Sequence, residues 1–217
     1  MNNNKILTDA FKWLFLGLLT CFAISYITTL DQNIINAVYN GFGGLSYLLY
    51  AIAEIVIAIC LTFFIKKLNP LLAKILFVLY SILTGLSLSG IFIIYTKTSI
   101  AFVFLATALI FGAFAIIGKT TKIDLSKWTV YLFVALLAII VLEIINIFLA
   151  NNTLNMVLCI VSILVFSAYV AYDVQFAIQK ASYGDTENIG IYCAFQLFVD
   201  FINLFIRLLN LFGNSDN

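Results

Sequence analysis

The sequence has no histidine, a single proline and few charged side chains. Only 10% of its 217 residues are charged, and its formal net charge is +1. The absence of histidine excludes histidine-based acid–base catalysis and histidine-ligated metals, and removes the side chain that usually senses pH near neutrality. A net charge near zero offers no basic surface to phosphate backbones, so we expect no nucleic-acid partner. Any proton sensing must therefore use carboxyl groups.

Apolar side chains are in excess. They make up 64% of the chain, with a mean hydropathy of +1.14, whereas an average soluble domain is about 45–50% apolar and about 25% charged. A domain of this size in water still exposes much of its surface. We therefore expect an integral membrane protein whose surroundings are the lipid bilayer, and we exclude a cytosolic enzyme and a secreted disulfide scaffold. The four cysteines lie within apolar stretches without C-x-x-C spacing, which favours small buried apolar residues over a redox or metal site.

Seven stretches are long and apolar enough to cross a membrane, which takes about 20 mostly apolar residues. The sequence predicts an all-α membrane protein: one domain, residues 1–217, forming a seven-transmembrane-helix bundle. The segment from Asp31 to Gly44 is predicted to be the longest loop. The predicted spans are 11–30, 45–65, 71–95, 100–118, 128–150, 154–178 and 189–212.

The positions of the basic residues predict the orientation. With a cytoplasmic N-terminus, every basic residue except Lys97 and Arg207 falls at a cytoplasmic helix end or loop, which satisfies the positive-inside rule. Seven spans then place the C-terminus outside. The alternative, a cleaved signal peptide in the first span, is disfavoured because its apolar run is long and no small-x-small site follows it.

Four acids lie within the predicted spans: Glu54, Glu143, Asp173 and Asp200. An aspartate near the centre of a membrane helix costs about 2.5–3.5 kcal/mol, and such residues usually mark a polar cavity, a proton relay or an ion path. A carboxyl pair that meets in the membrane cannot readily ionise at both members and titrates as a unit. Asp173 and Asp200 are on consecutive antiparallel spans, although helix rise puts them about one and a half turns apart in depth.

The last span carries a polar stripe about 80° wide at about 100° per residue. We infer that this helix lies in the bundle interior and lines a cavity, because interhelical hydrogen bonding alone, worth about 0.6 kcal/mol per bond, explains a carboxylate and a guanidinium poorly. The stripe consists of Tyr192, Gln196, Asp200, Asn203, Arg207 and Asn210.

Other residues are candidates for an ion path or for counter-ions. Glu54 is predicted near the midplane, either as part of a cation path or as a protonated acid bonded to a tyrosine or serine. Lys66 is a candidate counter-ion for Asp173, or simply a topology anchor. Asn203 and the two aspartates offer the oxygen ligands that calcium prefers. Arg207 and Glu143 are further candidates, and Glu143 has no specific role.

Two segments resemble the Bax-inhibitor-type (transmembrane Bax inhibitor motif) family. Residues 171–175, Ala-Tyr-Asp-Val-Gln, resemble its Y-D-x-Q signature, and residues 198–205, Phe-Val-Asp-Phe-Ile-Asn-Leu-Phe, resemble its L-x-L-D-F-I-N-L-F segment. The resemblance implies a seven-helix bundle with the last helix central, and a calcium-permeable leak gated by pH through an aspartate pair. That pair maps onto Asp173 and Asp200, which would hold calcium transiently. The chain departs from the family at Ala171, and Lys66 lacks the bidentate grip of an arginine.

The leading functional hypothesis is a pH-sensitive, calcium-permeable leak channel with no enzymatic activity and no cofactor, calcium and protons being the transported or sensed ions. The alternatives are a non-conducting regulator that binds another membrane protein, such as a membrane protease, and a proton-coupled transporter. Some members of the family are described as cell-death suppressors and some bacterial ones as modulators of a membrane protease. The compact chain suits a bacterial plasma membrane.

Overall fold

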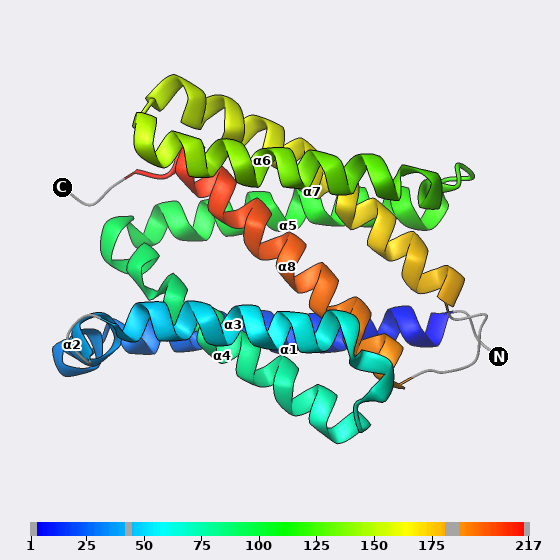
Figure 1. Ribbon diagram of the computed structural model, residues 1–217, viewed down its shortest axis with the longest axis horizontal. Helices are drawn as coiled ribbons and strands as arrows, with labels where there is room; N and C mark the ends of the chain where they lie inside the picture. The colour runs from blue at the N-terminus through cyan, green and yellow to red at the C-terminus, as the bar shows by residue number, and fades with distance from the viewer. Residues whose placement is uncertain (1–3, 42–44, 181–186, 215–217) are drawn as a thin grey trace.

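The computed structural model describes residues 4–41, 45–180 and 187–214, which form an all-α structure (Figure 1). Two short 3-10 helices, η2 (Ile65–Lys67) and η3 (Leu125–Trp128), precede α4 and α6. The α-helices are α1 (Asn4–Thr28), α2 (Gln32–Asn40), α3 (Ser46–Phe63), α4 (Pro70–Ile94), α5 (Lys97–Thr120), α6 (Thr129–Leu149), α7 (Asn152–Lys180) and α8 (Glu187–Phe212).

Within the described residues, six helices are long and apolar enough to cross a membrane, namely α1 and α4 to α8, and α3 is a shorter apolar helix. The expectation of an all-α membrane protein is confirmed at this level. Apart from α2, successive helices run in alternating directions along the molecule (Figure 1). As a result, α1 begins at one end of the bundle and α8 finishes at the other.

The segment predicted as the longest loop contains a helix, α2. Its N-cap is Asp31, whose carboxylate accepts a hydrogen bond from the Asn33 N–H at 2.7 Å, as N-cap side chains commonly do. The helix turns Val38 into the protein, and Tyr39 pairs with Ser89 of α4 at 2.9 Å. A search for runs of 20 apolar residues misses a helix this short and polar.

The most buried of the six long helices is α8. It contacts α1, α3, α4, α5 and α7, and its Phe198 and Phe205 are fully enclosed. Phe198 packs edge-on against Phe77 of α4, with ring centroids 5.8 Å apart. By contrast, α6 is the most exposed long helix, and packs chiefly on α7 and η3. The carboxyl group of Asp200, on this helix, is thus held inside the bundle.

Candidate functional site

Asp173 of α7 and Asp200 of α8 meet in the interior of the bundle. Their carboxyl groups lie within hydrogen-bonding reach of each other, and the two residues are only 5% and 4% exposed. Ionised carboxylates only accept hydrogen bonds, so the two carboxyl groups can bond to each other only when one of them holds a proton. The pair therefore has at least two protonation states that differ in attraction and repulsion.

The structure brings the two aspartates together although helix rise predicts a difference in their depth. The helix α7 has 29 residues and α8 has 26, or about 43 and 39 Å, whereas the hydrocarbon core of a membrane is about 30 Å thick. Neither helix end therefore marks the edge of the core, and a count of residues from a helix end does not give a depth in the membrane.

A pocket of about 470 Å³ adjoins the aspartate pair. Its wall combines phenylalanine rings with hydroxyl and amide groups, so an occupant would find oxygen ligands next to an acid pair. Oxygen ligands suit hard cations such as calcium. The lining residues come from α3 (Ala58, Thr62), α4 (Tyr80), α6 (Thr129, Phe133, Leu136), α7 (Phe166, Tyr169, Tyr172, Asp173, Phe176) and α8 (Tyr192, Phe195, Gln196, Val199, Asp200).

Two amide side chains hold the backbone around the pair, and sequence reasoning assigns a role to neither. Gln175, two residues after Asp173, donates to the Ile123 carbonyl and accepts from the Leu125 N–H, both at 2.8 Å. Asn188, in the first turn of α8, donates to the Ile65 and Leu68 carbonyls at 3.1 and 2.8 Å. Each amide ties an interhelical connection to the helix that carries an aspartate. The signal for Gln175 is its place in the Y-D-x-Q motif.

The polar stripe of α8 divides into two parts with different partners. Tyr192, Gln196 and Asp200 line the pocket. Further along, Asn203 donates to the Val199 carbonyl of its own helix at 2.8 Å, and is not among the residues that line the pocket. The structure therefore does not bring Asn203 to the aspartates as an oxygen ligand.

Arg207 forms an ion pair with Glu143 of α6. The sequence treats the two as separate candidates for an ion path, and gives Glu143 no role. In the structure each neutralises the other, with side-chain exposures of 17% and 29%. The ion pair connects α8 with α6.

Glu54 of α3 accepts a hydrogen bond from the Ser87 hydroxyl of α4 at 2.7 Å. This matches the alternative in which the acid is bonded to a serine. Glu54 does not line the pocket, but Ala58 and Thr62, which do, follow it by one and two helical turns on the same face of α3. Glu54 thus lies on the continuation of the pocket wall.

The structure does not bring Lys66 to Asp173. Lys66 is exposed in η2, and the bonds from Asn188 hold η2 at the first turn of α8. Asp200 lies about 18 Å further along that helix, too far for a lysine side chain to reach. Within the described part of the chain, no group of three or more Asp, Glu or Cys side chains is arranged to hold a metal ion.

Comparison with known proteins assigns the family. Residues 3–217 match the family model described as "Inhibitor of apoptosis-promoting Bax1". The chain belongs to the Bax inhibitor family. Bacterial members of this family are similar along most of its length. The "Inner membrane protein YbhL" of Escherichia coli (strain K12) is 36% identical over 214 residues, which cover 96% of this chain and 91% of YbhL.

Two other relatives in the Bax inhibitor family are described only as uncharacterized. A protein of Borreliella burgdorferi is 33% identical over 219 residues, covering 99% of this chain and 94% of the relative. A membrane protein of Streptococcus pyogenes serotype M1 is 35% identical over 169 residues, which cover 76% of this chain and 73% of the relative. The two segments that resemble Bax inhibitor signatures, 171–175 and 198–205, are those that supply Asp173 and Asp200.

Proposed function

We propose that this Bax inhibitor family member is a pH-sensitive, calcium-permeable leak channel of a bacterial plasma membrane. The observation that carries the proposal is the closely placed pair of Asp173 and Asp200, buried beside a pocket lined with oxygen-bearing side chains. The pair is the proton-sensing gate. Calcium is the cargo, and the proposal includes no resident cofactor and no catalytic reaction.

The gate works through the charge on the pair. With one proton shared, the hydrogen bond joins α7 to α8 and the pathway is shut. When that proton leaves, two carboxylates face each other in a medium of low dielectric constant, where like charges repel strongly. They then separate or recruit a cation, so calcium flux rises as the pair loses its proton.

The path extends from the pocket along α3 toward Glu54, which adds negative potential. Its Ser87 hydrogen bond holds the carboxylate in place. At the opposite side of the pocket, Gln175 and Asn188 fix the connections around the gate. Movement is then concentrated at the aspartates themselves.

The proposal includes a topology of seven spans, in which α3 crosses the membrane together with the six long helices and α8 is the central helix. At 18 residues, α3 is about 27 Å long, close to the thickness of the hydrocarbon core of about 30 Å. The many contacts of α8 support the central position. The basic residues place the start of α1 in the cytoplasm and the end of α8 outside.

The test is calcium influx into proteoliposomes of purified protein across a pH series. Wild-type flux is expected to rise with pH, while Asp200→Asn, which still donates a hydrogen bond to Asp173 but carries no charge, stays shut throughout. Asp31→Asn is the matched control, because asparagine also caps helices and Asp31 lies in the α2 cap. Asp200→Asn flux that follows the wild-type pH curve would refute the gate. Absence of flux from the pure protein, with a membrane-protein partner recovered by crosslinking, would favour the non-conducting regulator.

A further inference from the structure

An apolar groove runs between α1 and α5, and neither Asp173 nor Asp200 is among its lining residues. One part, of about 580 Å³, is lined by residues of α1, α5 and α7, and a second, of about 460 Å³, continues along α1 and α5 with a contribution from α4. Phe15 lines both parts. Near the groove, Phe111 of α5 packs against Phe201 of α8, with ring centroids 5.5 Å apart. Aromatic side chains thus support the groove from within.

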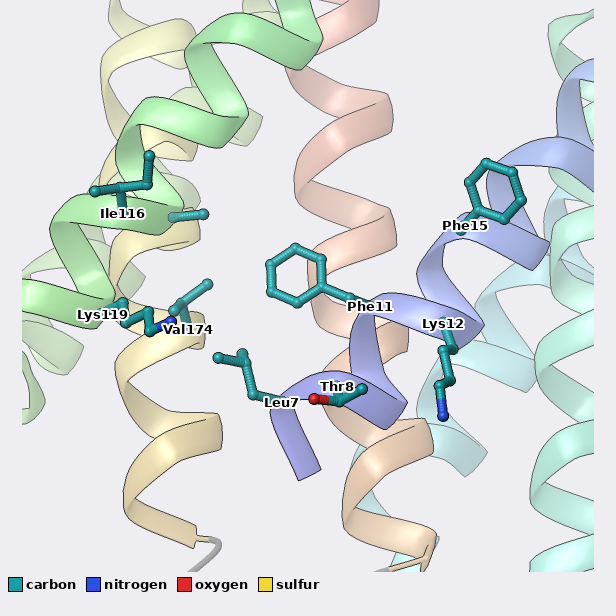
Figure 2. A pocket seen from close by; sticks show the side chains of 9 residues that line it. Leu7, Thr8, Phe11, Lys12, Phe15, Ile116, Lys119 and Val174 are labelled. Atoms are coloured by element: carbon teal, nitrogen blue, oxygen red, sulfur yellow. The ribbon is translucent and has the colours of Figure 1, made fainter. Parts of the chain in front are cut away.

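The groove carries two lysines at one end, and its wall beyond them is mostly apolar up to Lys97. Figure 2 shows Lys12 on α1 and Lys119 on α5 on opposite walls, with the Phe11 ring between the walls. The polar end is formed by the first turns of α1 and the last turn of α5, so it lies at the end of the bundle. This is the arrangement of an amphiphile with its head group at the membrane surface.

The charge at the polar end is basic. Lys12 and Lys119 line the groove, and Lys119 is exposed. The nearby acid, Asp9, pairs with Lys12 at 3.5 Å, with side-chain exposures of 37% and 69%. Exposed pairs of this kind contribute about 0–1 kcal/mol, so Lys12 can exchange Asp9 for a phosphate.

The groove is long enough for an acyl chain. From Lys119 back to Lys97, which lines its second part, α5 rises about 33 Å, about the thickness of the whole hydrocarbon core, whereas one lipid spans a single leaflet, about half of that core. At the far end Lys97 lies over the Tyr26 ring, 5.6 Å from its centroid. The groove therefore offers a full leaflet depth of apolar wall below the two lysines.

We propose that this groove is a binding site for an anionic phospholipid, with the phosphate head group between Lys12 and Lys119 and an acyl chain along Phe15 and Phe104. This inference is independent of the proposed channel activity, because no groove residue belongs to the gate. The lysines give selectivity for negative charge, and the apolar wall gives contact with the chain.

The test is native mass spectrometry of detergent-purified protein titrated with phosphatidylglycerol or phosphatidylcholine of identical acyl chains. Wild-type protein is expected to prefer phosphatidylglycerol. A lysine near an anionic lipid contributes about 1 kcal/mol, so replacing each lysine should weaken phosphatidylglycerol binding roughly fivefold. Lys12→Gln with Lys119→Gln should abolish the preference, and Lys12→Arg with Lys119→Arg should keep it. Lys67→Gln with Lys127→Gln, an equal loss of charge outside the groove, is the matched control.

Two more variants separate head-group from chain recognition. Asp9→Asn should strengthen phosphatidylglycerol binding, because it frees Lys12. Gly112 lies on the groove-facing stripe of α5, three and four residues before Ala115 and Ile116, and a β-carbon there meets nothing within 4 Å. Gly112→Leu should therefore weaken binding of both lipids and leave the preference unchanged.

Three results would overturn the proposal. The first is equal binding of phosphatidylglycerol and phosphatidylcholine by the wild type. The second is a loss of preference in Lys67→Gln with Lys127→Gln that equals the loss in Lys12→Gln with Lys119→Gln. The third is full displacement of phosphatidylglycerol by soluble glycerol phosphate, which would indicate a site for free phosphate.

Discussion

Gly118 of α5 and Ala171 of α7 bring two helix backbones into direct contact, two residues before Asp173. A β-carbon at Gly118 would come within 2.2 Å of the Ala171 carbonyl oxygen, and Gly118 itself is buried. The absence of a side chain at this position lets α7 lie close enough to present Asp173 to Asp200. The position of Asp173 depends on this contact.

Gly118→Ala is therefore expected to lower stability by about 1–3 kcal/mol, as overpacking of a tight interior does. The measurement is thermal unfolding in detergent. Gly112→Ala is the control on the same helix, where the added carbon has open space and replaces a residue of low helix propensity, a gain of about 0.8–1.0 kcal/mol. Equal stability of the two variants would contradict the role of Gly118.

The ion pair between Arg207 and Glu143 is expected to stabilise the attachment of α6. Glu143→Gln leaves a guanidinium without its partner, and Arg207→Gln leaves a carboxylate without its partner. The two single losses of stability should therefore add up to more than the loss in the double variant. A double-mutant cycle on unfolding free energy should give a coupling of about 0.5–3 kcal/mol. Additive single effects would show that the pair contributes nothing.

Asp124, at the N-cap of η3, is expected to make stability depend on acid pH. The Ser126 hydroxyl and N–H donate to its carboxylate at 2.7 and 3.1 Å, and these bonds lower the pKa of Asp124 below its ordinary value. Because the folded pKa is depressed, the stabilisation is present above the unfolded pKa of about 3.9. It is lost as pH falls through the folded value.

The check is a carboxyl carbon NMR titration of Asp124 in micelles. Ser126→Ala should raise the pKa of Asp124, because it removes the larger contribution. Lys127→Gln removes a smaller electrostatic contribution and should raise it less. A larger effect from Lys127→Gln would reverse this assignment.

The proposed topology predicts that the two ends of the bundle face different compartments. Single cysteines at Lys122 and at Asn151, in a background with the native cysteines replaced by serine or alanine, should differ in labelling by an impermeant maleimide. In intact cells Asn151 should label and Lys122 should not. Labelling of both positions from the same side would exclude the seven-span arrangement.

Hydropathy is sufficient to predict the long helices and the membrane class, because a run of about 20 apolar residues is unfavourable in water and has the length of a membrane span. The adjacency of α7 and α8 is predictable from consecutive antiparallel spans, but helix rise alone places Asp173 and Asp200 at different depths and does not predict that they meet. The ion pair of Glu143 with Arg207 is not predictable in this way, since α6 and α8 are not consecutive and only long side chains join them. Lys66 does not act as a counter-ion because Asn188 holds η2, the turn that contains Lys66, at the start of α8. This tertiary contact has no signal in the composition of the sequence.

The loose attachment of α6 determines where this bundle deforms most easily. It supplies one wall of the aspartate pocket, yet buries only Leu132 and Ile139 within the described structure. Tilting this helix outward would rupture its ion pair with α8 and part of its packing on α7 and η3, and would leave the aromatic packing of α8 undisturbed. The acyl chains around α6 would add to the energy barrier for such a lateral opening, which makes the thickness and fluidity of the host bilayer determinants of how readily the pocket widens.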